Sequence, residues 1–115
     1  MTLFELRRLC RLWQKRLRLE NWAIAISFGT PAEMKDNLGS AGYDPRDLAA
    51  DILIMPGATD ARYHDGGIEQ TVIHELLHLV LHGDTEYAGE DVRQERSINV
   101  IADALYWAYR GKRRQ

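Results

Sequence analysis

Apolar residues near the start of the chain recur at the spacing of one helix face, at Leu6, Leu9, Cys10, Trp13 and Leu17. Thr2 and Glu5 stand three residues apart, as in a capping box, where each side chain hydrogen-bonds the other residue's backbone N–H. A helix is therefore predicted to begin at about Leu3, and Asn21 can end it.

The next hydrophobic pattern has the period of two that is typical of strands. Small residues alternate with large apolar ones between residues 22 and 28, the large ones being Trp22, Ile24, Ile26 and Phe28. This predicts a half-buried strand. Two more strands are predicted: a short one at residues 39–44, turned by the sequence Asp-Pro-Arg-Asp, and one at residues 49–55, stopped by a Pro-Gly pair.

Helical periodicity returns in the second half of the chain. One helix is predicted at residues 68–82, because Gly83 suits the left-handed cap that ends helices. Asp91 and Gln94 have capping spacing and start a last helix that runs to about Arg110. This order of a helix, two or three strands and two helices is typical of an α+β fold. The length predicts one domain, residues 1–115.

The composition is that of an ordinary globular chain, with 45% hydrophobic and 28% charged residues. The single cysteine, Cys10, excludes an internal disulfide and favours a reducing compartment. No apolar run is long enough to cross a membrane, and arginines interrupt the early apolar stretch that a signal peptide would need. We therefore expect a cytoplasmic protein without a membrane partner.

Charge is distributed unevenly, although the formal net charge is only −2. Residues 1–20 carry six basic and two acidic side chains, residues 21–109 carry five and fifteen, and residues 110–115 carry four basic ones. The basic ends would allow a nucleic-acid contact through Arg7, Arg8, Arg11, Lys15, Arg16 and Arg18. A solvated helix face is favoured instead, because charge runs usually lie at the surface and no aromatic residues interleave with the tail. A nucleic acid is therefore not the expected partner.

After its first turn, the predicted helix at residues 68–82 gathers its ionisable side chains on one side of an otherwise apolar surface. At about 100° per residue, one narrow stripe holds His74, Glu75, His78 and His82. A helix that is apolar on most sides is buried, and burying unpaired ionisable groups costs several kcal/mol. A bound metal ion would satisfy this stripe.

His74, Glu75 and His78 form the pattern His-Glu-x-x-His, which provides two metal ligands and a general base on one helix face. The two imidazoles stand one turn apart, so both can reach one ion, and zinc favours histidine nitrogen. His82 lies in the last turn, where an imidazolium complements the helix dipole. Its alternative role is a contact in the cleft, either to substrate or to a metal ligand.

A catalytic zinc site needs a third protein ligand. The candidates are the acidic residues after the histidine helix, Asp84, Glu86, Glu90, Asp91 and Glu95. Glu95 is predicted, because it lies at the rim of the buried face of the last helix, in a row with Asn99 and Tyr106. Asn99, one turn on, is expected to hydrogen-bond a metal ligand. The alternative for Glu95 is an ordinary half-exposed surface glutamate.

The sequence His-Glu-Leu-Leu-His, followed by Glu-Arg-Ser-Ile-Asn-Val-Ile-Ala, resembles the gluzincin metallopeptidases, in which a later helix supplies a glutamate ligand. More narrowly, it is similar to ImmA/IrrE-like and related minimal zincin metallopeptidases, which carry a Glu, an Asn and a small residue at the spacing of Glu95, Asn99 and Ala102. The resemblance covers about residues 68–105. It departs from the family at Ile98 and Ile101, where Ala and Phe are usual. It implies a minimal zincin-like domain that hydrolyses peptides at one zinc ion.

The same resemblance implies an edge strand over the cleft that pairs with an extended substrate. We expect residues 50–55 to form this strand, with the substrate contacts Asp51, Ile52, Leu53 and Ile54.

The expected reaction is hydrolysis of a peptide or protein substrate by a zinc-activated water, with Glu75 as general base. A donor to the developing oxyanion is also needed, and the candidates are Tyr106, His82, Tyr87 and His64. Two other functions stay open. One is a structural zinc-binding interaction module that contacts nucleic acid through its basic ends, and the other is a non-peptidase zinc hydrolase. An open coordination position would favour an enzyme, whereas a fourth protein ligand would favour the structural module.

Overall fold

A computed structural model of the chain describes residues 1–35, 37–56, 67–82 and 92–111. Its elements, in chain order, are α1 (Leu3–Arg16), β1 (Ala23–Phe28), α2 (Pro31–Met34), β2 (Gly39–Asp44), β3 (Ala49–Ile54), α3 (Gly67–His82) and α4 (Val92–Arg110). The predicted α+β class is confirmed, because a small mixed sheet lies between an N-terminal helix and two later helices in the chain.

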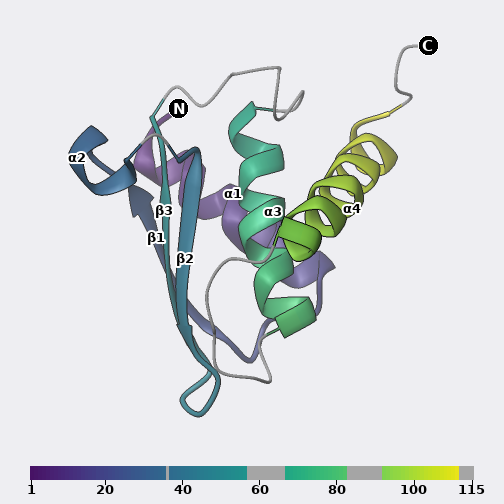
Figure 1. The fold of residues 1–115 in the computed structure, drawn as a ribbon, viewed down its shortest axis with the longest axis horizontal. Coiled ribbons are helices and arrows are strands. Elements are labelled where there is room, and N and C mark those ends of the chain that lie inside the picture. The colour runs from purple at the N-terminus through teal and green to yellow at the C-terminus, as the bar shows by residue number, and fades with distance from the viewer. Residues whose placement is uncertain (36, 57–66, 83–91, 112–115) are drawn as a thin grey trace.

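The sheet has the strand order β1-β3-β2 (Figure 1). β1 pairs with β3 in parallel, with Ala23 opposite Ala49, and β2 pairs with β3 antiparallel, with Gly39 opposite Ile54. β2 and β3 form a hairpin, and β3 lies between β2 and β1. In the described sheet, β1 and β2 are therefore the two edge strands.

The prediction that residues 50–55 form an edge strand is wrong. β3 has a partner on each side, so the ladders on both sides use its backbone N–H and C=O groups and leave none for a substrate. The predicted substrate contacts are therefore residues of the central strand, namely Asp51, Ile52, Leu53 and Ile54. Ile52 and Ile54 point into the core, where they are 1% and 0% exposed.

Capping boxes start two of the helices. The Thr2 hydroxyl accepts a hydrogen bond from the Glu5 backbone at 3.1 Å, and the Glu5 carboxylate accepts one from the Thr2 backbone at 2.9 Å. Thr30 and Glu33 form the same box at the start of α2. The sequence carries this second signal, but α2 was not predicted because it is only one turn long. α1 ends at Arg16, earlier than Asn21.

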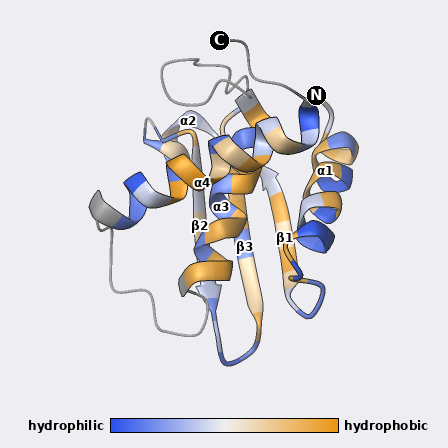
Figure 2. Cartoon of the chain, turned by 90° about the vertical axis from the view of Figure 1, so that its right-hand side faces the viewer, coloured by the Kyte–Doolittle hydropathy of each residue, from blue (hydrophilic) through white to orange (hydrophobic). Residues whose placement is uncertain are grey.

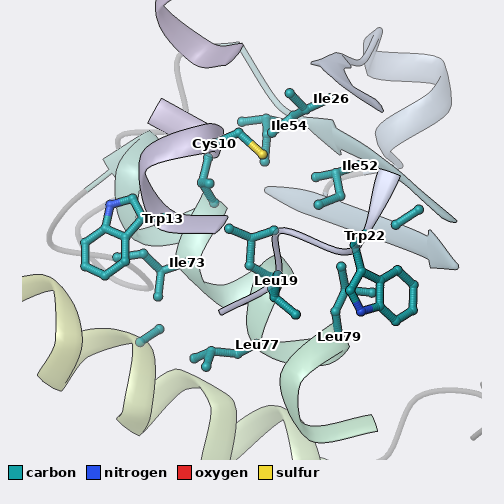
Figure 3. Packing of buried hydrophobic residues seen from close by; sticks show 14 of the residues in the cluster. Cys10, Trp13, Leu19, Trp22, Ile26, Ile52, Ile54, Ile73, Leu77 and Leu79 are labelled. Carbon is teal, nitrogen blue, oxygen red and sulfur yellow. The ribbon is translucent and has the colours of Figure 1, made fainter. Parts of the chain in front are cut away.

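The core lies between one face of the sheet and the helices. α1 and α3 pack on the sheet, and α4 packs on α3 (Figures 1 and 2). Figure 3 shows Cys10 of α1 beside Ile26 and Ile54 of the sheet, and Trp13 beside Ile73 of α3. α3 is buried on most sides, as the sequence predicts, and contributes the buried residues Val72, Ile73, Leu76, Leu77 and Leu79.

Candidate metal centre

The central turns of the helix α3 carry three ionisable residues into the interior. His74, Glu75 and His78 are 7%, 4% and 7% exposed, on a helix whose other central residues are apolar. The i and i+4 spacing of the histidines places both imidazoles on the same side of α3, where their ring centroids lie 5.2 Å apart. Burial of this side of the helix is therefore favourable only if its ionisable groups have polar partners.

The first turn of α4 supplies one such partner. The Glu95 Oε2 atom lies 2.9 Å from His74 Nε2, and its Oε1 atom lies 3.0 Å from His78 Nε2. One carboxylate thus bridges two imidazoles that come from another helix. The structure brings together the three residues that the sequence analysis selected as metal ligands, and it places Glu95 at the α3–α4 contact rather than on a free surface.

These three side chains can hold a metal ion. Each offers one ligand atom, and the three atoms all lie within 4.8 Å of one another. A tetrahedral ion with ligand bonds of about 2.0–2.2 Å needs its ligand atoms about 3.3–3.6 Å apart. The two histidine–glutamate distances are a few tenths of an ångström shorter than this, so small side-chain rotations would open the group to a metal. Two imidazoles and a carboxylate suit several divalent transition metals.

The three side chains of the group differ in exposure. About a third of the Glu95 side chain is exposed, at 34%, whereas the two histidine side chains are 9% exposed. Glu95 is therefore the most exposed of the three side chains.

Glu75 lies next to His74, the first residue of the candidate metal group, and the start of β2 covers it. A Cβ atom added to Gly39 would lie 3.1 Å from Glu75 Cγ and 2.8 Å from Thr71 Cγ2. Only a residue without a side chain lets the β2 backbone approach α3 this closely. This role of Gly39 could not be recognised from the sequence, because a lone glycine at the start of a predicted strand does not reveal what lies opposite it.

Two of the predicted supporting residues do not reach the group. Asn99 is exposed on α4, and it has no hydrogen bond to any of the three ligands among the described residues. Tyr106 is eleven residues beyond Glu95 on the same helix, which is about 16 Å along its axis. Tyr106 is therefore too far from Glu95 to donate to an oxyanion at this site, because a tyrosine side chain is much shorter than that.

Other residues named from the sequence lie outside what the structure describes. His82 ends α3, but its side chain is not among the described ones. Two oxyanion candidates, His64 and Tyr87, also lie outside the described residues. The same is true of the four alternative candidates for the third ligand, Asp84, Glu86, Glu90 and Asp91.

A second buried carboxylate, Glu69, stands in the first turn of α3. It accepts a hydrogen bond from the Trp13 indole nitrogen at 2.7 Å and pairs with the Arg110 guanidinium through both oxygens. This carboxylate raises the pKa of Arg110 by hydrogen bonding to it. The Arg16 guanidinium lies 4.1 Å from the ring centre of Tyr109, which stacks edge-on against Trp13. This cluster fixes α1 and the end of α4 to α3 and was not expected from the sequence.

Comparison of the chain with models of protein families, with curated proteins and with solved structures gives no match. Among the described residues, no helix is both long and apolar enough to cross a membrane.

Proposed function

We propose that the protein is a zinc-dependent peptidase of the minimal zincin type. The observation that carries this proposal is the convergence of His74, His78 and Glu95 on one point, with Glu75 next to the first ligand on the same helix. This is the arrangement that the pattern His-Glu-x-x-His requires, with two ligands and a base from one helix and a third ligand from elsewhere. Zinc is the proposed metal because it favours histidine and carboxylate ligands at catalytic sites.

Zinc bound to the three ligands would activate a water molecule and polarise the substrate carbonyl. The residues of the chain would do the rest. His74 and His78 would hold the ion from α3, and Glu95 would close the ligand set from α4. Glu75 would accept the proton of the water as the scissile bond is attacked and then pass it to the departing amine, as general base and general acid.

The substrate strand belongs on β2 rather than on β3. β2 is the edge strand that packs on α3, and its first residue, Gly39, lies against Glu75. An extended peptide that added to the edge of β2 that no described strand occupies would place its backbone beside the proposed base. The family resemblance implies that an edge strand pairs with the substrate. We assign this role to residues 39–44 instead of residues 50–55.

The first test compares two neighbouring substitutions on α3. His74→Ala removes a ligand and should abolish stoichiometric zinc binding. Glu75→Gln keeps the size and hydrogen bonding of the side chain but cannot accept the proton, so it should retain one zinc ion per chain. Its cleavage of a peptide library should fall at least about 100-fold, the low end for general acid–base catalysis. Zinc content is measured by mass spectrometry after dialysis, and cleavage by product analysis.

Two results would contradict the proposal in different ways. If the wild-type protein holds zinc firmly but cleaves no peptide in a broad library, the zinc is structural or serves another hydrolysis. If Glu75→Gln cleaves as fast as the wild type, a peptidase activity remains, but Glu75 is not its base.

A further inference from the structure

The other edge of the sheet carries a groove that the metal centre does not use. It has a volume of about 970 Å³ and lies between α1 and the edge strand β1, with a lining that also reaches β3. Figure 2 shows α1 running beside β1, on the outer side of this edge. The Gln14 amide donates hydrogen bonds to the backbone oxygens of Leu19 and Trp22, at 2.9 and 2.8 Å. These bonds fix the turn between α1 and β1 and hold the helix beside the strand.

The backbone of β1 along this groove has the form of an unpaired strand edge. Ala23 donates to the Leu48 oxygen at 2.8 Å and Gly29 donates to the Ile54 oxygen at 3.0 Å, so the odd-numbered residues of β1 face β3. Backbone groups alternate along a strand. The N–H and C=O groups of Ile24, Ile26 and Phe28 therefore face outward, where no described strand pairs with them.

Basic side chains follow the same groove on α1. Arg7, Arg11 and Lys15 line it, all three are exposed, and none forms an ion pair with a described residue. Their spacing of four residues corresponds to about 6 Å along a helix. Side chains on one face of a strand repeat every two residues, at about 6.7 Å. A strand added beside β1 would thus present its helix-facing side chains at nearly the same intervals as these three basic groups.

The groove lining also contains two acidic residues, which would repel negative side chains of a bound strand. Glu20 lies at the end of the groove beyond α1, and the exposed Asp51 lies on the sheet face that points away from the helices. Negative side chains are therefore favoured only on the helix-facing side of an added strand. Neutral or basic side chains are favoured on the other side.

We propose that this groove binds an extended acidic segment of a partner protein, which adds to the β1 edge as a further strand. Its backbone would pair with the outward N–H and C=O groups of Ile24, Ile26 and Phe28. Its alternate acidic side chains would lie under Arg7, Arg11 and Lys15. The site is separate from the proposed peptidase centre, which lies at α3 and β2, and it does not depend on that function.

Two other occupants fit the groove less well. A second copy of the chain, paired through its own β1 edge, would bring two sets of these basic side chains together without acidic partners. A nucleic acid would meet the basic side chains, but its phosphates would also meet the outward carbonyl oxygens of β1, which repel them. An acidic peptide strand satisfies both the charges and the backbone.

The test uses the full chain and a labelled decapeptide in which Glu and Thr alternate. A peptide of the same composition, with all Glu before all Thr, is the sequence control. We expect saturable binding of the alternating peptide in fluorescence anisotropy and at least about fivefold weaker binding of the block peptide. N-methyl groups placed on all Glu residues or on all Thr residues block opposite edges of the peptide strand. One of the two patterns should abolish binding, and the other should be tolerated.

Charge reversals on α1 test the partner chemistry. The double variant Arg7→Glu/Arg11→Glu should weaken binding at least about tenfold. The matched variant Arg8→Glu/Arg18→Glu makes the same change in net charge outside the groove lining and should change binding less than about twofold.

Four results would overturn the proposal. They are equal binding of the alternating and block peptides, equal effects of the two methylation patterns, equal effects of the two charge reversals, and displacement of the peptide by a single-stranded oligonucleotide at physiological salt. The last would assign the groove to nucleic acid. A fifth result would also overturn the proposal. If the unliganded chain dimerises and Arg7→Glu/Arg11→Glu alters that dimerisation, the groove is an interface with a second copy.

Discussion

At the scale of single residues, the fold changes how readily Cys10 loses its proton. Burial raises the pKa of the Cys10 thiol to about 11, because a thiolate is poorly solvated beneath α1. The folded state therefore holds this proton more tightly than the unfolded chain does. The resulting stability is complete below the unfolded pKa of about 9 and is lost as the pH rises towards 11.

This loss of stability at high pH can be measured. Between pH 8 and 11 the free energy of unfolding of the wild type should fall by about 2 kcal/mol more than that of Cys10→Ala, which has no thiol to titrate. Urea titrations of both proteins at the two pH values measure the difference. Parallel pH profiles would show that Cys10 does not titrate differently in the folded state.

The features of the candidate metal site that could be predicted are those that depend on the angular positions of residues around a helix axis. His74 and His78 share one side of α3 because they are one turn apart, and Glu95 was selected by its place on the wheel of the last helix. The same wheel placed Tyr106 beside Glu95, although the two are far apart along α4. A helical wheel gives direction but not distance along the axis. The wheel could therefore predict that His74, His78 and Glu95 converge, but not that Tyr106 lies far from them.

At the scale of elements, the cluster around Glu69 determines how the helices dock. Glu69 is 8% exposed and binds Trp13 of α1 and Arg110 of α4. Glu69→Ala leaves the indole N–H and one end of the guanidinium without their acceptor. We expect a loss of about 2–3 kcal/mol in unfolding free energy, below the full cost of breaking a buried ion pair because Arg110 is half exposed.

A double-mutant cycle isolates the pairwise part of this loss. Trp13→Phe removes the indole N–H but keeps an aromatic ring in the core. If the hydrogen bond matters, the effects of Trp13→Phe and Glu69→Ala in urea denaturation will be less than additive by at least about 0.5 kcal/mol. Strict additivity would mean that Glu69 acts on Arg110 alone.

The order of the strands is what the sequence left undetermined. All three strands could be located, because alternation and turn residues are local signals. Which of them lies in the middle depends on the pairing of β1 with β3 across α2 and β2, and no local pattern encodes that pairing. The error assigned the edge position to β3, which is central, rather than to β2, and it also hid the close approach of Gly39 to Glu75.

At the scale of the whole molecule, the candidate metal group connects two helices, α3 and α4. His74 and His78 belong to α3, at the centre of the core, whereas Glu95 belongs to α4, which packs chiefly on α3. A metal held by all three residues would bind the folded chain and not the unfolded one. Metal binding is then linked to folding, and zinc should stabilise the domain through the docking of α4.

The size of this linkage follows from mass action. Free zinc at about 100 times its Kd should raise the free energy of unfolding by about 2.7 kcal/mol, and a chelator should remove that increment. Glu75→Gln should gain the same increment as the wild type, because its side chain is proposed not to touch the ion. Glu95→Ala should gain less at equal zinc, since losing even an outer partner of a metal ligand weakens binding about 10- to 100-fold. Thermal unfolding over a zinc titration measures all three proteins. An equal increment in Glu95→Ala would remove Glu95 from the ligand set and leave α4 without a role in metal binding.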